Sequence, residues 1–230
     1  MTDKGLSVTD KGLLEMDKDL SGAMKGPPTL RGLRVENWQQ IWKTCISLRS
    51  MLNEFDVLQD VSKKLAGLGI PYMLTGSLAM NYYSQPRMTR DIDIVIEAQP
   101  EDVNNLVSIF EPDYYVDGKA VARAIAHKRA FNIIHHEAFI KVDCIIKKPS
   151  TYREVEFDRR QKVTIQAFPV WLVSKEDLII SKLDWARDSR SELQLGDVKN
   201  LLASGYDVEY LARWTKDLGL GPLLDECLND

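Results

Sequence analysis

The sequence has few cysteines and no long apolar run, and each shortage argues against a class of protein. Three cysteines occur among 230 residues, Cys45, Cys144 and Cys227, and they form no C-x-x-C pair. This wide spacing argues against a disulfide framework or a zinc site and is typical of free thiols in a reducing compartment. No segment is apolar enough to cross a bilayer, and the N-terminus lacks the basic-then-apolar order of a secretory signal. We therefore expect a cytoplasmic protein without a membrane partner.

The chain also lacks a strong net charge, although its charges are unevenly distributed. The formal net charge is −4, which argues against a protein that binds nucleic acid through overall positive charge. Residues 119–162, however, contain 11 basic and 5 acidic residues. Such a basic stretch suits a polyanionic substrate, and it is equally typical of an ordinary solvated surface.

The periodicity of apolar residues divides the chain into three parts. Residues 1–33 show no sustained periodicity and predict a mobile tail. Residues 34–172 begin with a helical pattern over 35–68 and continue with short strands, whereas residues 173–230 are helical. We expect an α+β fold in which a small mixed β-sheet is flanked by helices and followed by a helical C-terminal region.

Turn residues and alternation place the individual elements. The expected strands cover 72–75, 91–96, 130–135, 138–146 and 161–170. The expected helices after the first cover 78–83, 101–110, 174–187, 196–202 and 208–218, while 120–126 fits neither pattern clearly.

Two carboxylates lie one residue apart inside the apolar run 91–96. Successive strand residues point to opposite faces, so Asp91 and Asp93 share one face and Ile92 and Ile94 share the other. The two acids would lie roughly 6.5–7 Å apart, close enough to hold a hard divalent cation between them. Without a cation they would repel each other and carry a desolvation cost. The pair therefore predicts a divalent-cation site.

Two further features extend this pair into a candidate site. Asp143 lies in the apolar strand 139–146 and can join the pair if the strands are neighbours, since adjacent strands stand about 4.8 Å apart. Gly76 and Ser77 come between a strand and a short helix, where a glycine permits close approach of a phosphate and a helix N-terminus binds it. Three acids facing a phosphate-binding turn predict in-line transfer at phosphorus.

These residues resemble the DNA polymerase β superfamily of nucleotidyltransferases. The Arg-x-Thr-x-Asp-Ile-Asp form is most similar to the AbiEii-type toxin nucleotidyltransferases of bacterial toxin–antitoxin systems. The residues that carry the resemblance are Gly76, Ser77, Arg87, Thr89, Asp91, Ile92, Asp93 and, on a later strand, Asp143. The segment 181–190 followed by Asp197 is similar to that family's Lys-plus-Arg helix and following Asp. The resemblance implies that residues 34–172 form a catalytic domain.

The resemblance also implies a role for each matching residue. Gly76, Ser77, Arg87 and Lys182 would bind a nucleoside triphosphate such as ATP. The catalytic and magnesium-binding carboxylates would be Asp91, Asp93 and Asp143, and Asp143 would help to activate the acceptor hydroxyl. Because the spacing after Arg190 departs from the family pattern, the sequence assigns no role to Arg187, Arg190 or Asp197.

The expected activity is Mg²⁺-dependent transfer of a nucleoside monophosphate to an acceptor hydroxyl. A toxin-like enzyme would modify RNA, such as a tRNA end, and would have an antitoxin partner. One alternative is transfer to an antibiotic, which predicts an acidic acceptor pocket for a cationic drug, with Glu111, Asp113 and Asp117 as candidates. Another is a nucleotide-binding protein of the same fold without turnover.

Several of these residues also have ordinary structural interpretations. Arg87 can pair with the acids beside it, and Lys182 can flank the apolar stripe of its helix. The five tryptophans are expected in core or subdomain contacts rather than as base-stacking platforms. The consecutive His135 and His136 have diverging side chains, so they are not expected to bind one metal ion.

Overall fold

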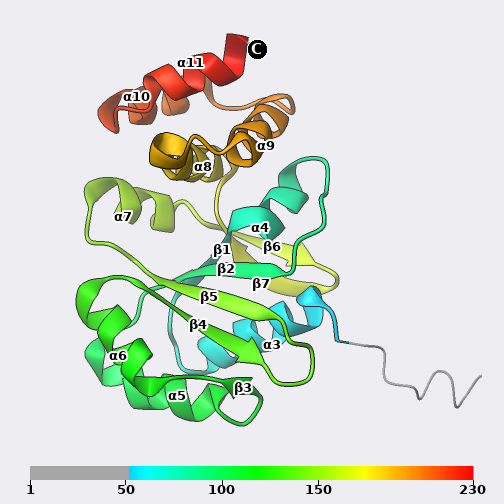
Figure 1. Ribbon diagram of the computed structural model, residues 1–230, viewed down its shortest axis with the longest axis vertical. Helices are drawn as coiled ribbons and strands as arrows, with labels where there is room; N and C mark the ends of the chain where they lie inside the picture. Colours follow the sequence, from blue (N-terminus) through cyan, green and yellow to red (C-terminus); the bar gives the residue numbers. More distant parts are fainter. Residues whose placement is uncertain (1–51, 230) are drawn as a thin grey trace, which may run out of the picture. The chain divides into compact units, whose positions relative to one another are not determined.

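A seven-stranded mixed β-sheet organises residues 52–229, the part of the chain that the computed structural model describes (Figure 1). The strand order is β3-β4-β5-β2-β1-β7-β6. Two neighbouring pairs are parallel, β2 with β5 and β1 with β7, and the others are antiparallel. The strands are β1 (Tyr72–Thr75), β2 (Asp91–Ile96), β3 (Tyr114–Tyr115), β4 (Ala130–His135), β5 (Lys141–Ile146), β6 (Gln161–Ile165) and β7 (Phe168–Leu172). The expected α+β fold with a small mixed sheet is confirmed.

Helices precede, interrupt and follow the strands. The helices that alternate with the strands are α3 (Glu54–Gly67), α4 (Gly76–Tyr83), the 3-10 helix η1 (Pro100–Asp102), α5 (Val103–Phe110), α6 (Gly118–His127) and α7 (Thr151–Asp158). The C-terminal helices are α8 (Lys175–Ser189), α9 (Glu192–Leu202), α10 (Val208–Asp217) and α11 (Gly221–Asn229). Figure 1 shows α8–α11 grouped at one end, with α4 and α7 between them and the strands. None of the helices in residues 52–229 is long and apolar enough to cross a bilayer.

Alternation along the two central strands separates a buried face from an open one. On β2, Ile92, Ile94 and Ile96 are completely buried, whereas the residues between them are partly or fully exposed. The same pattern holds on β5, where Val142 and Cys144 are buried. Because side chains alternate with a period of two, the acids of both strands must share the open face.

Helix α3 covers part of the buried face. Its apolar residues Val57, Leu58, Val61 and Leu65 follow a spacing of three and four, are all buried, and lie on the side that packs against β2 and β7. Asn53 begins the helix with a capping box. The expected helical pattern over 35–68 is thus confirmed for its second half, while its first half and the expected tail 1–33 lie outside the described residues.

The strand expected over 161–170 is in fact two strands. β6 and β7 form a hairpin whose central residues, Gln166 and Ala167, both have positive φ, 44° and 70°. Two consecutive left-handed residues make the tight turn that matches strand twist, and Asn or Gly usually occupies them. Gln and Ala carry no such signal, so the sequence prediction of one strand was wrong.

Four other elements also differ from the expectation. Helix α7, with Ser150 as its N-cap, and the short strand β3 were not predicted. The ambiguous region around 120–126 is helical, as α6. Strand β5 begins at Lys141 rather than at 138, because Phe139 has φ 53° and extends the turn after β4.

Candidate active site

Three aspartates gather on the open face of the parallel pair β2 and β5. Asp93 is the register partner of Asp143, and Asp91 lies two residues before Asp93, on the same face of the strand. The side chain of Asp91 is 61% exposed and that of Asp143 is 26% exposed. The structure therefore brings together the three carboxylates that the sequence singled out, at the point where the two strands begin.

The grouping of the three carboxylates disfavours the ionised form of Asp93. Burial, and then repulsion from Asp143 and Asp91, raises the pKa of Asp93 from 3.8 to about 6. Nearby Lys141 and Lys182 offset only part of this rise. A cation placed among these carboxylates would remove the repulsion and favour the ionised form.

Lys141 is a cation that the chain itself places among the carboxylates. It is the register partner of Asp91, and its Nζ lies 2.9 Å from Asp143 Oδ2 and 3.8 Å from Asp91 Oδ1. The hydrogen bond to Asp143 raises the pKa of Lys141. Sequence reasoning missed Lys141, although its position two residues before Asp143 puts it on the same strand face.

The glycine at the start of α4 is required by two independent features. Gly76 has φ +68°, a conformation that other residues rarely adopt. A Cβ atom at this position would lie 2.0 Å from Oδ2 of Asp93, which no real side chain tolerates. Glycine thus lets the first turn of α4 approach the Asp93 carboxylate directly.

The first turn of α4 has an open N-terminus. Thr75 is the N-cap residue, and its side chain makes no capping hydrogen bond. The first backbone N–H groups of a helix have no intrahelical partner, so here they remain free to bind an anion. Ser77 lies in this turn, and its Oγ accepts a hydrogen bond from Arg87 Nη2 at 2.5 Å.

A buried carboxylate holds two cations beside this turn. Asp197 accepts hydrogen bonds from Lys182 Nζ at 2.7 Å and from Arg87 Nε and Nη2 at 3.1 Å each. The side chains of Lys182 and Asp197 are 5% and 3% exposed. Burial alone would raise the pKa of Asp197, but the hydrogen bonds from Arg87 and Lys182 outweigh it and hold the pKa below its ordinary value.

This network decides between two interpretations of the basic residues. Arg87 pairs with Asp197, which is 110 positions away in the sequence, rather than with the acids beside it. Lys182 is buried and hydrogen-bonded to Asp197 and Gln194, so the alternative interpretation, that it merely flanks an apolar stripe, does not hold. Asp197 thus belongs to the candidate site, although the sequence assigned it no role. A contact between residues 110 positions apart leaves no pattern in the local sequence.

The other two basic residues of the C-terminal motif lie elsewhere. Arg187 donates to the carbonyl of Leu218 at 3.0 Å and pairs with Asp184. Arg190 pairs with Glu226 at 2.8 Å. Both arginines tie α8 to the C-terminal helices, and neither lines the pocket described next.

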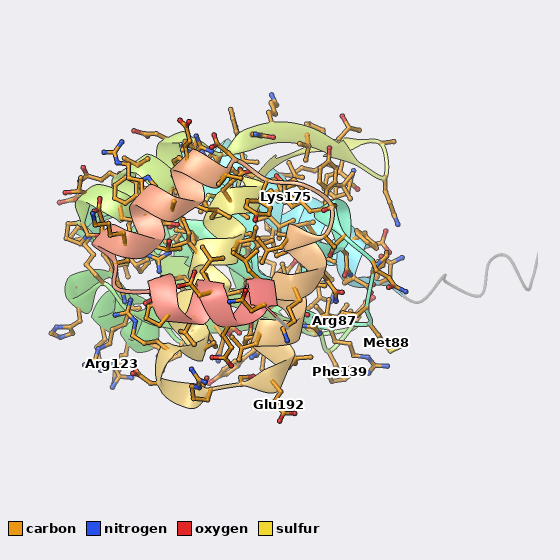
Figure 2. All side chains as sticks on the ribbon, turned by 90° about the horizontal axis from the view of Figure 1, so that it is seen from above. Arg87, Met88, Arg123, Phe139, Lys175 and Glu192 are labelled. Carbon is orange, nitrogen blue, oxygen red and sulfur yellow. The ribbon has the colours of Figure 1, made fainter. Side chains whose placement is uncertain are left out.

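A cavity of about 380 Å³ contains all of the predicted site residues. We call it the catalytic pocket. Its charged lining consists of Arg87, Asp91, Asp93, Lys141, Asp143 and Lys182, and its other lining residues include Gly76, Ser77, Trp185 and Gln194. Its size is in the range of ligand-binding pockets. Figure 2 shows Arg87 on the same side of the molecule as Met88 and Phe139. Met88 lies in the loop before β2 and is 91% exposed, and Phe139 lies in the loop before β5 and is 83% exposed.

Trp185 departs from the expectation for tryptophans. It is 69% exposed and lines the catalytic pocket, whereas Trp214 is buried and Trp171 packs against the core. The prediction of a core role was therefore wrong for Trp185. Trp38 and Trp42 lie outside the described residues.

No cluster of three or more His, Cys, Asp or Glu side chains within residues 52–229 is arranged to hold a metal ion by itself. Lys141 lies between two of the carboxylates instead. Mg²⁺ is usually bound through one or two carboxylates together with substrate phosphates, rather than by a complete protein cage. The oxygen-only donor set and the raised pKa of Asp93 fit such a shared site.

Comparison with solved structures finds 13 similar chains. The antibiotic-resistance factor ANT(2'')-Ia gives a TM-score of 0.47 at 14% identity, over 74% of this chain and 95% of that chain. The lincosamide antibiotic adenylyltransferase LnuA gives 0.45 at 15% identity, over 66% and 98%. An antigenic nucleotidyltransferase-like protein from Paracoccidioides brasiliensis gives 0.46 at 18% identity, over 75% and 91%.

Comparison of the sequence with protein families is more decisive. No curated protein matches the sequence. The family model described as "Nucleotidyltransferase of unknown function (DUF6036)" matches residues 47–217 and contains every residue of the candidate site. The finer resemblance to AbiEii-type toxins stays a prediction. Since the match covers well over half of the chain, the protein belongs to this family and is a nucleotidyltransferase.

Proposed function

We propose that the protein transfers a nucleoside monophosphate from a nucleoside triphosphate such as ATP to an acceptor hydroxyl, in a Mg²⁺-dependent reaction. The observation that carries this proposal is the register of β2 and β5. It sets Asp93 beside Asp143, with Asp91 on the same face. Gly76 adds the phosphate-binding turn directly against Asp93.

The carboxylates are suited to Mg²⁺, which prefers oxygen ligands. Asp91 and Asp93 would hold it, with Asp143 as a further ligand. When bound, the ion would neutralise charge on the triphosphate and lower the pKa of the acceptor hydroxyl. Without the ion, Lys141 offsets part of the negative charge of Asp143 and Asp91, which lie 2.9 and 3.8 Å from its Nζ.

The basic residues and the first turn of α4 would bind the triphosphate. Free backbone N–H groups and Ser77 Oγ face the phosphates, and Arg87 and Lys182 supply positive charge. Asp197 neutralises only one of these two charges, so the trio keeps a net positive charge for the anionic ligand. Fixing both cations on one buried carboxylate reduces the side-chain ordering needed when substrate binds.

The reaction balances without a further reactant. The acceptor oxygen forms a bond to the α-phosphorus, and the bond from that phosphorus to the bridging oxygen breaks, which releases pyrophosphate. Asp143 accepts the hydroxyl proton at a carboxylate oxygen, because it is the register partner of Asp93 and its side chain is accessible from the pocket. Arg87 and Lys182 stabilise the charge that develops on the pyrophosphate.

We propose RNA as the acceptor rather than a cationic antibiotic. A cationic drug needs an acidic acceptor pocket. The acids considered for that pocket, Glu111, Asp113 and Asp117, do not line the catalytic pocket, and Asp113 pairs with Lys64 at 2.8 Å. The cavity that adjoins the catalytic pocket is basic instead. Charge therefore favours an anionic acceptor.

The experiment incubates the purified protein with each α-³²P-labelled nucleoside triphosphate, Mg²⁺ and total RNA, with tobramycin and lincomycin as alternative acceptors. We expect label in RNA, and a loss of at least about 10³-fold in Asp93→Asn, because this change removes charge at the centre of the site. Asp158→Asn changes an exposed acid away from the pocket and serves as the matched control.

Each result has a distinct meaning. Label that moves only into an antibiotic would replace the RNA proposal with small-molecule transfer. Triphosphate binding without transfer to any acceptor, in the wild type as in Asp93→Asn, would contradict the proposed reaction and leave a nucleotide-binding protein.

A further inference from the structure

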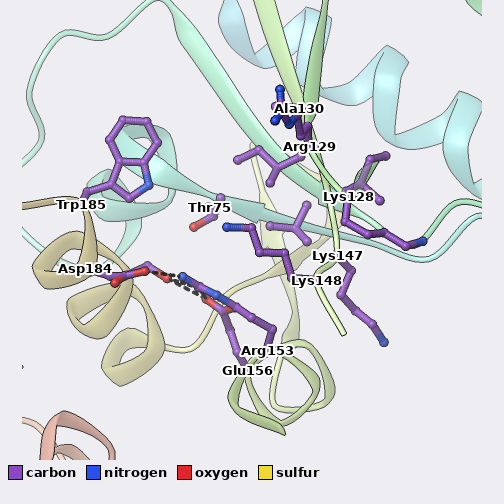
Figure 3. Close-up of a pocket in the computed structure, with 14 residues that line it drawn as sticks. Thr75, Lys128, Arg129, Ala130, Lys147, Lys148, Arg153, Glu156, Asp184 and Trp185 are labelled. Carbon is purple, nitrogen blue, oxygen red and sulfur yellow. Dashed lines mark hydrogen bonds and ion pairs between the residues drawn. The ribbon is translucent and has the colours of Figure 1, made fainter. Parts of the chain in front are cut away.

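A second cavity of about 380 Å³ adjoins the catalytic pocket. The two cavities share Thr75, Ile145, Ser181 and Trp185 as lining residues, so they are adjacent. Figure 3 shows this cavity, which lies between α7, α8 and the strands β4 and β5. We call it the basic pocket.

The lining of the basic pocket contains five cations and two carboxylates. Arg153 already binds both carboxylates, with hydrogen bonds to Glu156 at 2.8 and 2.9 Å and to Asp184 at 3.0 Å (Figure 3). Lys147 forms an ion pair with Glu97 at 2.5 Å. The positive charge of these two residues is therefore compensated within the protein.

The other three cations, Lys128, Arg129 and Lys148, form no ion pair within residues 52–229. Each follows the end of an element: Lys128 is the C-cap of α6 with φ 50°, and Lys148 comes after β5. Three uncompensated positive charges around one cavity create a positive potential that attracts an anion.

The basic pocket also offers an aromatic surface. Trp185 is 69% exposed, and Figure 3 shows it across the cavity from Lys128. Val95, Ala130 and Ile145 contribute apolar side chains to the lining. An exposed aromatic ring next to a group of cations is the combination that binds nucleotides, since the ring stacks on a base and the cations bind the phosphate.

We propose that the basic pocket binds a nucleotide unit of the acceptor, with its phosphate at Lys128, Arg129 and Lys148 and its base on Trp185. This inference rests on the proposed function, because it assigns the acceptor to the cavity next to Asp143. The triphosphate has its own cations, Arg87 and Lys182, in the catalytic pocket. Because the two pockets share four lining residues, an acceptor bound in the basic pocket would have its hydroxyl beside the catalytic pocket.

The test measures binding of a fluorescein-labelled single-stranded RNA dodecamer by anisotropy, without nucleoside triphosphate. The variant Lys128→Gln/Arg129→Gln/Lys148→Gln removes the three uncompensated cations. The matched control, Lys63→Gln/Arg123→Gln/Lys216→Gln, changes net charge equally at exposed positions outside both pockets. We expect binding at least tenfold weaker in the first variant than in the control. The slope of log affinity against log salt should be smaller by about 0.7, the contribution of one phosphate contact on a single strand.

A competition experiment then tests the recognised group. Adenosine monophosphate should displace the RNA from the wild type, and adenosine should do so at least tenfold less well, because it lacks the phosphate. Equal displacement by the two compounds would overturn the phosphate assignment. An equal loss of RNA binding in the two triple variants would overturn the site, since the effect would then follow net charge alone.

The same measurement separates this inference from the proposed function. Asp93→Asn should bind the RNA as the wild type does while losing nucleotidyl transfer. RNA binding that does not depend on the three cations, in a protein that still transfers label, would contradict the inference and leave the proposed reaction intact. Circular dichroism of each variant checks that the fold is retained.

Discussion

The catalytic pocket and the basic pocket are neighbours of similar volume that differ in how their charges are compensated. In the catalytic pocket three acidic and three basic side chains balance, and Arg87, Lys141 and Lys182 each contact a carboxylate. In the basic pocket three of five cations have no ion pair within residues 52–229. The cations of the catalytic pocket are therefore compensated by carboxylates of the protein, whereas three cations of the basic pocket are available to a bound anion.

This difference has a physical basis in burial. Lys182 and Asp197 are nearly inaccessible, and a buried charge without a partner is very costly. Arg129 and Lys148 are exposed, so water compensates their charge. Substitutions should therefore affect stability in the catalytic pocket and binding in the basic pocket.

The largest expected effect on stability comes from Asp197→Ala. It leaves the buried ammonium of Lys182 and the guanidinium of Arg87 without their carboxylate, so we expect a loss of about 3–5 kcal/mol in the free energy of unfolding. Urea unfolding followed by circular dichroism measures the loss. Lys148→Ala in the basic pocket is the comparison, with an expected change within about 0.5 kcal/mol. Similar losses for both variants would remove the distinction between the pockets.

The next effect is a pH-dependent gain of stability in Asp93→Asn. The pKa of Asp93 in the folded protein is about 6, above the 3.8 of a free carboxyl, so the folded state binds this proton more tightly. Ionisation of Asp93 therefore costs stability as the pH rises from about 4 to about 6, up to roughly 2–3 kcal/mol. In EDTA, the variant should match the wild type near pH 4 and be more stable above pH 6.

Thermal unfolding from pH 4 to 8 gives this comparison, with Asp158→Asn as the exposed control. A wild type whose stability relative to Asp93→Asn does not change with pH would contradict the raised pKa of Asp93, and with it the combined effect of burial and of the neighbouring carboxylates. Added Mg²⁺ should reduce the deficit of the wild type, because a ligand that binds only the folded state stabilises it.

A smaller effect, on RNA binding, is expected for Trp185, which lines both pockets. Trp185→Ala removes the exposed ring, and we expect RNA binding about tenfold weaker, since stacking of one base contributes about 1–3 kcal/mol. Trp185→Phe keeps a stacking surface and should recover most of the affinity. If both variants bind RNA as the wild type does, the base does not lie on Trp185.

The smallest expected effect is a change in divalent-ion affinity of the catalytic pocket when Lys141 is replaced. Lys141→Gln removes the cation between Asp91 and Asp143, so a divalent ion no longer competes with it. We expect Mn²⁺ to bind roughly fivefold more tightly, in line with about 1 kcal/mol for a partly exposed charge pair. Electron paramagnetic resonance of free Mn²⁺ measures the affinity. Weaker binding in the variant would mean that Lys141 positions the carboxylates for the ion.

Regular alternation made much of the fold predictable. The bounds of β1, β2 and β4 agree with the sequence prediction, because Pro71 and Gly76 flank β1 and buried apolar residues alternate with more exposed ones along β2 and most of β4. The hairpin of β6 and β7 could not be predicted, since Gln166 and Ala167 adopt positive φ only in the context of the paired strands. Helix α7 was missed because its eight residues contain too few apolar positions to show a helical period.

The residues of the candidate site were likewise only partly predictable from the sequence. Local patterns identified Gly76, Ser77, Asp91 and Asp93, because a turn and a strand pair act over a few residues. Asp143 depended on a register that the sequence suggested and the parallel pairing of β2 and β5 supplied. Lys141 was not predicted as a site residue, although the same register places it opposite Asp91.

The sequence by itself determined the type of site, since alternation along one strand must put Asp91 and Asp93 on one face, and a glycine before a short helix permits close approach of a phosphate. The tertiary structure decided which distant groups complete it. Asp197 meets Arg87 across 110 positions, and Lys128 and Trp185 come to face one cavity from two separate helices. Such contacts depend on how helices and strands pack, which local spacing does not encode.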